Sequence, residues 1–173
     1  MPRYVALLRG VNVGGKRTVP MSELRRLFES LGHSDVSTFI QSGNVLFASR
    51  TQVAPADLET AMADRFAIVI PVVLRTHREL EAVLGRNPFG HVNASKLHVG
   101  FMAAKPSAAA VAGIDAASFH PDRLATRDRE VYLHLPNGMG RSKLPAHLER
   151  QLKIPVTFRN WNTVTKLCEL SGS

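Results

Sequence analysis

The sequence contains little that is typical of a secreted or metal-bound protein. Its 173 residues include one cysteine, Cys168, which excludes an internal disulfide and a cysteine-based metal site. The seven histidines are scattered and none has metal-ligand spacing, so we expect no metal and no cofactor. Aromatic residues make up only 6% of the chain, and the expected central strands lack the paired aromatics on which RNA-binding sheets stack bases.

Long apolar runs are also missing. The longest, residues 66–74, contains Pro71 and lies between Arg65 and Arg75. It is far shorter than the roughly 20 residues that cross a bilayer. The first residues show no basic stretch followed by an apolar region, so we expect no signal peptide. Together with the single cysteine, these features predict a cytoplasmic protein with no membrane partner.

The charge is positive and unevenly distributed. The net charge is +8, and 45% of the residues are apolar, enough to build a core. Residues 1–85 hold 10 Lys and Arg against 8 Asp and Glu, whereas residues 86–173 hold 12 against 6. The second half is therefore the better candidate for an anionic partner, although the excess charge has solubility as an alternative explanation.

Apolar spacing predicts the same order of elements twice. In the first half we expect strands at 3–9, 36–41, 45–48 and 71–75, and helices at 20–31, from Pro55 onward and at 76–84. In the second half we expect strands at 97–102, 118–125, 130–135 and 156–159, and helices at 106–113, 143–152 and 162–170. The fold class is therefore α+β, with two tandem βαββαβ units, each with a trailing helix.

An internal echo supports the repeat. Residues 73–77 (VLRTH) and 157–161 (TFRNW) each read as a short strand that ends in arginine and leads into a polar helix start. Residues 86–96, with Asn87-Pro88 and Gly90, read as a linker. We therefore expect subdomains at 1–85 and 97–173.

The order of elements also predicts which loops meet. In a βαββαβ unit we expect an antiparallel sheet with strand order 4-1-3-2. The end of strand one, the start of helix one and the turn between strands two and three then share one edge. The opposite edge holds the start of helix two and the end of strand four.

The first polar cluster lies at the former edge of the first unit. Glycines expose backbone N–H groups, a helix start adds partial positive charge, and cations complete a candidate anion site. The alternative is a purely structural glycine-rich connection. The candidate ligand-binding residues are Arg9, Asn12, Gly14, Gly15, Lys16, Gln41, Ser42 and Asn44.

A nucleotide-hydrolysing phosphate loop is excluded. Residues 10–16 fit the first seven positions of G-x-x-x-x-G-K-[ST]. The next residue is Arg17, where a magnesium-binding hydroxyl is required, and the helix is expected only from Pro20.

The second polar cluster lies at the opposite edge of the second unit. A glycine loop again leads into a helix beside cations, with a tryptophan as a stacking surface. The alternative is that Ser142 or Asn162 only caps a helix and the tryptophan belongs to the core. The candidate ligand-binding residues are Arg141, Ser142, Lys143, Asn160, Trp161 and Asn162.

Four segments resemble the signatures of a bacterial family, domain of unknown function 1697. They are 6–16 (ALLRGVNVGGK), 40–45 (IQSGNV), 140–144 (GRSKL) and 159–164 (RNWNTV). The resemblance extends over essentially the whole chain. It implies a two-subdomain α+β fold resembling paired ferredoxin-like units, and it implies no established activity.

Three functions remain open from the sequence. The first is binding of a phosphate-bearing ligand, either a small molecule such as a nucleotide or a nucleic acid backbone. The second is an enzyme acting on a small anionic substrate, although neither cluster contains a carboxylate or histidine as a general base. The third is a structural or protein-interaction module that pairs through an exposed edge strand.

Overall fold

The computed structural model describes residues 1–12, 18–40 and 43–172. Two compact units divide the chain. The first unit contains Met1–Glu81 and Leu167–Ser173, and the second contains Ala82–Lys166. Each has a four-stranded antiparallel sheet, so the α+β class is confirmed.

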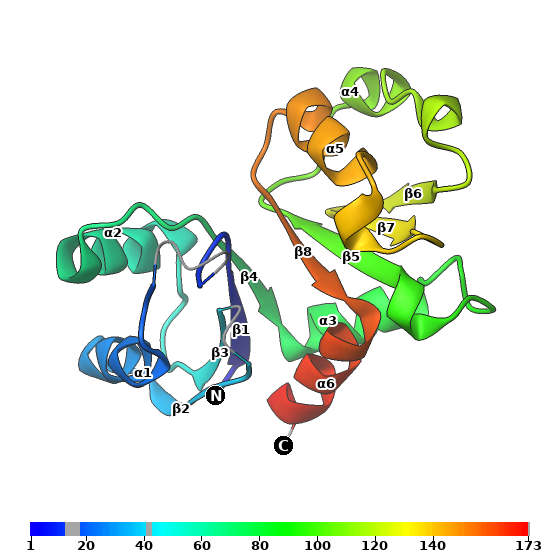
Figure 1. The fold of residues 1–173 in the computed structure, drawn as a ribbon. Coiled ribbons are helices and arrows are strands. Elements are labelled where there is room, and N and C mark those ends of the chain that lie inside the picture. Colours follow the sequence, from blue (N-terminus) through cyan, green and yellow to red (C-terminus); the bar gives the residue numbers. More distant parts are fainter. Residues whose placement is uncertain (13–17, 41–42, 173) are drawn as a thin grey trace. The chain divides into compact units, whose positions relative to one another are not determined.

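The first unit is built on the sheet β2-β3-β1-β4. Its strands are β1 (Arg3–Leu8), β2 (Ser34–Thr38), β3 (Asn44–Ala48) and β4 (Val72–Thr76). Helices α1 (Met21–Ser30) and α2 (Pro55–Phe66) cover one face of this sheet, as Figure 1 shows. The central strand β1 pairs with both β3 and β4, which gives the predicted strand order 4-1-3-2.

Both helices form because their apolar residues recur on one side. Leu24 and Phe28 are the buried residues of α1, and Leu58 and Met62 are those of α2. Pro55 occupies the first turn of α2, where its missing N–H breaks no helical hydrogen bond. These four side chains close the hydrophobic core against β1, β3 and β4.

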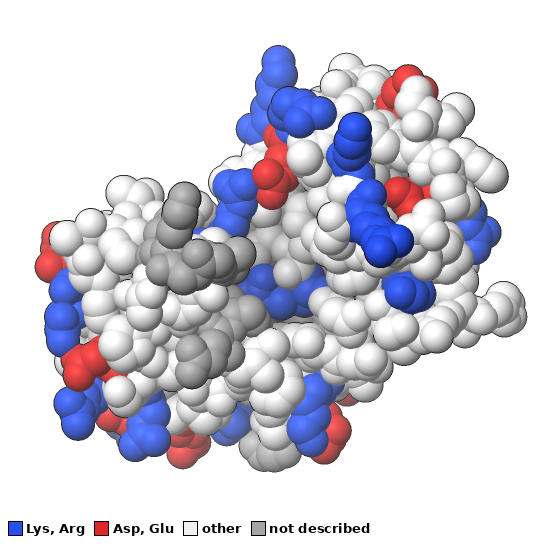
Figure 2. All heavy atoms as spheres, in the orientation of Figure 1, with Lys and Arg blue, Asp and Glu red and all other residues white. Residues whose placement is uncertain are grey.

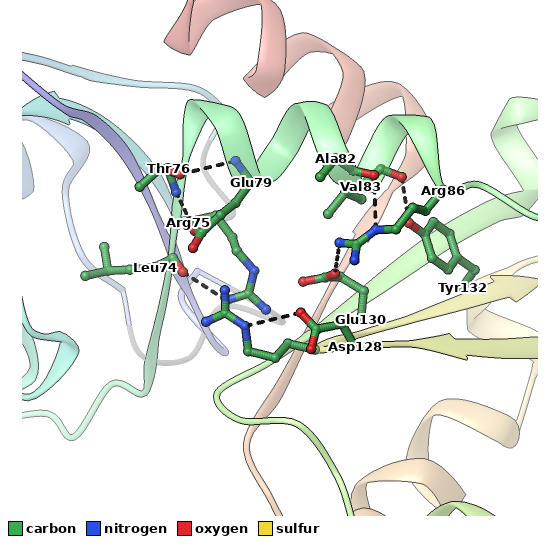
Figure 3. Close-up of polar contacts among 11 residues, drawn as sticks. Leu74, Arg75, Thr76, Glu79, Ala82, Val83, Arg86, Asp128, Glu130 and Tyr132 are labelled. Carbon is green, nitrogen blue, oxygen red and sulfur yellow. Dashed lines mark hydrogen bonds and ion pairs between the residues drawn. The ribbon is translucent and has the colours of Figure 1, made fainter.

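Helix α3 (His77–Gly85) follows β4 directly and begins with a reciprocal cap. The Thr76 backbone N–H donates to Glu79 Oε2 at 2.8 Å, and the Glu79 N–H donates to Thr76 Oγ1 at 3.2 Å (Figure 3). This arrangement is a capping box, which satisfies two N–H groups that the helix itself leaves unpaired.

The second unit repeats this plan with the sheet β6-β7-β5-β8. Its strands are β5 (Leu97–Met102), β6 (Arg123–Arg127), β7 (Glu130–His134) and β8 (Val156–Asn160). Its helices are α4 (Ala108–Ala112), α5 (Leu144–Leu152) and the start of α6 (Trp161–Ser171), with the short 3₁₀ turns η1 (Ala94–Lys96), η2 (Ala116–Phe119) and η3 (Met139–Arg141). Leu144, Leu148 and Leu152 of α5 pack on β5, β7 and β8.

The internal echo is confirmed in the strand register. Arg75 lies opposite Val5 in the first unit, and Arg159 lies opposite Val99 in the second. Both arginines are buried, and each donates from Nη1 at 2.9 Å to the carbonyl of its preceding residue. Burial lowers the pKa of Arg159 to about 10.

One predicted strand is wrong in its first half. We expected a strand at 118–125, but residues Ala116–Phe119 form a 3₁₀ turn and β6 begins at Arg123. Pro121 lies inside the predicted strand, and proline has no N–H for the ladder. The Asp122 N–H donates to the Phe119 carbonyl at 2.8 Å, so the chain turns there before the strand starts.

The last turn of α6 belongs to the first unit, although α6 begins in the second. Arg3 Nε donates to the Ser171 carbonyl at 2.8 Å across 168 residues of sequence. The predicted division into 1–85 and 97–173 did not anticipate this return of the chain, and the predicted domain limits stay a prediction. No helix of the described residues is long and apolar enough to cross a membrane.

Candidate anion-binding site

The described residues of the first polar cluster lie close together at the predicted edge of the first unit. The Leu8 N–H donates to the Gly43 carbonyl at 2.8 Å, so the end of β1 meets the turn before β3. Gly43 has φ +90°, and an added Cβ would lie 2.9 Å from Leu8 Cβ. Both the backbone conformation and the close approach therefore require glycine at this position.

Two asparagines of this cluster stabilise the backbone around it. Asn12 Oδ1 accepts from the Val19 N–H at 2.8 Å, and its Nδ2 donates to the Val19 carbonyl at 3.1 Å. The buried Asn44 donates from Nδ2 to the Phe39 carbonyl at 2.9 Å. These bonds join the two ends of residues 12–19 and close the turn between β2 and β3.

The other candidates of the first cluster are placed only in part. Arg9 is half-buried, and its N–H donates to the Pro71 carbonyl at 3.0 Å. The remaining candidates lie outside the described residues, namely Gly14, Gly15, Lys16, Gln41 and Ser42.

The second cluster lies where the chain topology predicted it. Because β5 is antiparallel to β7 and β8, the start of β5 lies beside the ends of both neighbours. Helix α5 connects β7 to β8, so its first turn lies at the same end of the sheet. We call this end of the second unit the basic edge. It is formed by Lys96, His98, Arg141, Ser142, Lys143 and Asn160.

The start of α5 at the basic edge carries exposed positive charge. Arg141 and Lys143 are both exposed and flank Ser142, and the first turn of α5 contains no acidic residue. Ser142 Oγ accepts from the Leu144 N–H at 3.1 Å and donates to Asp122 Oδ2 at 2.7 Å. Ser142, which precedes the N-cap residue Lys143, therefore satisfies the first N–H of α5 and is itself held by Asp122, and the two cations beside it are exposed.

The 3₁₀ turn η1 supplies a third cation to the basic edge. A Cβ added to Gly138 would lie 3.9 Å from Lys96 Nζ, so this ammonium group lies beside the glycine loop. Asn160 Nδ2 donates to the Ser95 carbonyl at 3.2 Å and ties η1 to the end of β8. Lys96 and Ser95 lie in the segment 86–96, which the sequence suggested only as a linker.

Trp161 and Asn162 are arranged differently from the other residues of the second cluster. The Trp161 ring is half-buried, with its centroid 6.4 Å from that of Tyr132. The exposed Asn162 donates its backbone N–H to Asn160 Oδ1 at 2.9 Å, so Asn160 caps the first turn of α6. Trp161 therefore contributes to packing beside Tyr132 as well as to the exposed surface.

Figure 2 shows Lys and Arg side chains gathered over α5 and the loop that precedes it. The second unit as a whole holds 12 Lys and Arg against 5 Asp and Glu, a net charge of +7. Almost the entire excess charge of the protein therefore lies in this unit. Such a concentration raises the local density of anions and speeds their association.

Besides Lys96, His98 of the basic edge and Asp122, which contacts this edge, were missed by the sequence analysis. His98 is 7% exposed, and its Nδ1 has no hydrogen-bond partner among the described residues. Burial lowers the pKa of His98 and the charge of Lys96 lowers it further, so the ring is neutral at neutral pH. Asp122 reaches the site through Ser142. The alternation of side chains along β5 does not indicate that His98 lies at this site. The 20-residue separation of Asp122 and Ser142 likewise gives no sign in the sequence that their side chains meet.

The described residues contain no group of three or more His, Cys, Asp or Glu side chains arranged to hold a metal ion. What the basic edge offers is hydrogen-bond donors and fixed positive charge. Both are suited to phosphate or carboxylate oxygens.

Comparison with known proteins identifies a family to which the chain is similar. The model of the family described as "Protein of unknown function (DUF1697)" matches residues 1–132. The chain belongs to this family. The match confirms the suspected family and contains the motifs at 6–16 and 40–45, whereas those at 140–144 and 159–164 lie beyond it. The description of DUF1697 names no activity. No curated protein matches the chain at a significant level.

A solved structure is similar to the chain over its full length. It is the conserved bacterial protein SP0830 from Streptococcus pneumoniae, with 26% sequence identity and a TM-score of 0.76. The similarity covers 100% of this chain and 99% of that protein. The DUF1697 match itself ends at Tyr132, before most of the basic edge, so the similarity to SP0830 is what extends over Arg141, Lys143 and Asn160.

Proposed function

We propose that this DUF1697 protein binds a phosphate-bearing ligand, a nucleotide or a nucleic acid backbone, at the basic edge of its second unit. The observation that carries the proposal is the start of α5, where exposed Arg141 and Lys143 flank the Ser142 hydroxyl and no acidic residue lies in the first turn. A helix start of this kind attracts anions through its dipole and through the two full charges.

The surrounding contacts support a site whose backbone is already ordered. Ser142 is held by Asp122, and Asn160 holds η1 against the end of β8. Lys96 lies beside Gly138 as a third cation. A ligand that binds there does not have to order these segments, so less binding free energy is lost.

The experiment measures binding of a fluorescently labelled single-stranded oligonucleotide by anisotropy at several salt concentrations, together with thermal shifts by nucleotides. The variant Arg141→Gln/Lys143→Gln removes two cations of the basic edge. We expect at least about tenfold weaker binding, because charge-assisted bonds are lost. For the oligonucleotide, the slope of log affinity against log salt should fall by about 1.4, since each lost phosphate contact removes about 0.7.

The matched control is Lys105→Gln/Arg127→Gln, which makes the same charge change in the same unit. Lys105 follows the end of β5, and Arg127 ends β6, so both lie at the sheet end opposite the basic edge. Both side chains are exposed. Equal losses in the two double variants, or binding that does not respond to salt, would refute the proposal.

Two finer assignments are part of the same proposal. We propose that each unit is ferredoxin-like, which the strand orders β2-β3-β1-β4 and β6-β7-β5-β8 support. We also propose a cytoplasmic location, for which the single free and buried Cys168 is the supporting feature.

A further inference from the structure

We propose a second binding site, in the first unit, that takes a small organic acid with one carboxylate or phosphate group on an apolar body. The site is an open pocket of about 510 Å³. Its size falls within the range of about 300–1,000 Å³ that is usual for small-molecule sites. The pocket lies where β1 begins, β4 passes into α3 and α6 ends. Its lining residues are Pro2, Arg3, Thr76, His77, Arg78, Ser171 and Gly172.

Arg3 forms one wall, and its guanidinium is fixed by the backbone. Arg3 Nε donates to the Ser171 carbonyl at 2.8 Å, while Nη1 lies 3.6 Å from Asp35 Oδ2. The Asp35 side chain is 71% exposed, so water weakens this ion pair. Arg3 thus gives the pocket a cation of defined position.

His77 and the end of α6 form another part of the pocket lining. His77 Nδ1 lies 3.0 Å from Ser171 Oγ, which also donates to the Cys168 carbonyl at 3.0 Å. A Cβ added to Gly172 would lie 2.7 Å from His77 Cε1, so only glycine permits this approach of backbone and ring. This part of the lining is therefore shaped before any ligand arrives.

Arg78 is the group that decides the class of ligand. Its side chain is exposed at the first turn of α3, and it forms no ion pair with any described residue. None of the described lining residues is acidic, and most of the lining surface is apolar. The Glu79 N–H of α3 is already satisfied by Thr76, and the arginine side chains supply the positive charge for an anion.

A guanidinium over apolar walls selects amphipathic anions. An acid group pairs with the fork of Arg78 or Arg3, and the apolar body covers carbon surface in the pocket. An inorganic anion gains only the pairing with the guanidinium, and a neutral analogue gains only the burial of its apolar body. Among the described residues, Arg3 and Arg78 are the Lys and Arg side chains that line this pocket, and exposed cations such as Arg25 and Lys143 do not.

Isothermal titration of the full chain with four probes tests the site. The probes are phenyl phosphate, benzoate, inorganic phosphate and benzyl alcohol. We expect saturable binding of phenyl phosphate, benzoate or both, and at least about tenfold weaker binding of inorganic phosphate and of benzyl alcohol. Preference between the two acids identifies the head group as phosphate or carboxylate. No binding of either acid, or equal binding of inorganic phosphate, overturns the proposal.

Three single variants locate the binding. Arg78→Gln should weaken the preferred acid at least about tenfold, because the charge-assisted bond is lost. Arg25→Gln removes an exposed arginine of the same unit and should bind as the wild-type chain does. Arg141→Gln removes a cation of the basic edge, so any loss that it causes reports binding of the acid there and not in the pocket. An Arg78→Gln affinity equal to wild type overturns the proposal, and so does a loss confined to Arg141→Gln.

Discussion

At the residue scale, Tyr132 illustrates how burial and one hydrogen bond govern a side chain. Its hydroxyl donates to the Val83 carbonyl at 2.6 Å (Figure 3). The Tyr132 side chain is fully buried. Burial, and after it the neighbouring charge of Glu130, together raise the pKa of Tyr132 to about 12 against the opposing charges of Arg86 and Arg127. The phenol therefore stays protonated in the folded chain.

The raised pKa predicts how stability depends on pH. Tyr132→Phe removes the bond to Val83 and should lower the free energy of unfolding by about 1 kcal/mol at pH 7. Above pH 10 the unfolded tyrosine ionises, whereas the folded one does not until about pH 12. The wild-type chain therefore loses stability over this window and the variant does not, so their difference shrinks.

Urea unfolding of both chains at pH 7, 9 and 10.5 measures this difference. All other ionisable groups are present in both chains, so their contributions cancel in the difference between wild type and variant. A wild-type advantage that stays constant from pH 9 to pH 10.5 would contradict the assigned environment of Tyr132.

Single residues also show what the sequence left undetermined. Asparagine in a glycine-rich turn indicates a polar site, but its side chain bonds equally well to a ligand or to the neighbouring backbone. Asn12, Asn44 and Asn160 all bond to backbone groups in the structure. The positions were identified from the sequence, whereas the partners depend on contacts between distant segments that local patterns do not encode.

At the element scale, the start of α3 depends on the capping box between Thr76 and Glu79. Thr76→Ala and Glu79→Ala should each lower the free energy of unfolding by about 0.5–2 kcal/mol. The double variant should lose less than the sum, because both changes break the same reciprocal pair. Chemical denaturation of the three variants measures this coupling.

Glu81→Ala is the matched control on the same helix. Glu81 pairs with His77 at 3.5 Å, but its side chain is 61% exposed, so its loss should change stability by less than about 0.5 kcal/mol. Strict additivity of the Thr76 and Glu79 variants would show that the two residues act independently and not as a capping box.

The order of elements was the most predictable feature of the fold. Helical spacing and strand alternation are local, and they predicted both βαββαβ runs and the strand order 4-1-3-2 that the sheets show. The strand expected at 118–125 was wrong in its first half, where the chain forms a 3₁₀ turn and Pro121 offers no N–H to a strand ladder. Lys96 was missed for the basic edge because a linker composition gives no sign of what the linker packs against.

At the scale of the whole molecule, the chain returns to its beginning. Ser171 bonds to Arg3 and to His77, which precede it by 168 and 94 residues. The apolar spacing of residues 162–170 predicted a helix but did not show which sheet its end would pack on. The apolar face of a helix is suited to packing on either sheet, so the spacing of apolar residues does not determine which sheet the end of α6 contacts.

This return predicts a long-range contribution to stability at one hydroxyl. Ser171→Ala removes the Oγ that lies 3.0 Å from His77 Nδ1, within a residue that is 1% exposed. The free energy of unfolding should fall by about 1–3 kcal/mol, because a polar group is left without its partner. Thr165→Ala is the control on the same helix, since Thr165 Oγ1 also donates to a helical carbonyl, that of Trp161, but is exposed.

The Thr165 variant should stay within about 0.5 kcal/mol of the wild-type chain, as exposed substitutions usually do. The difference between the two variants therefore isolates the bond to His77 from the local helix bond that both hydroxyls make. His77→Phe, which keeps a ring against Gly172 but cannot bond to Ser171, should reproduce most of the Ser171→Ala loss. If Ser171→Ala and Thr165→Ala have equal effects, the end of α6 is held by its own helix and by Arg3, and His77 contributes only its ring contact with Gly172.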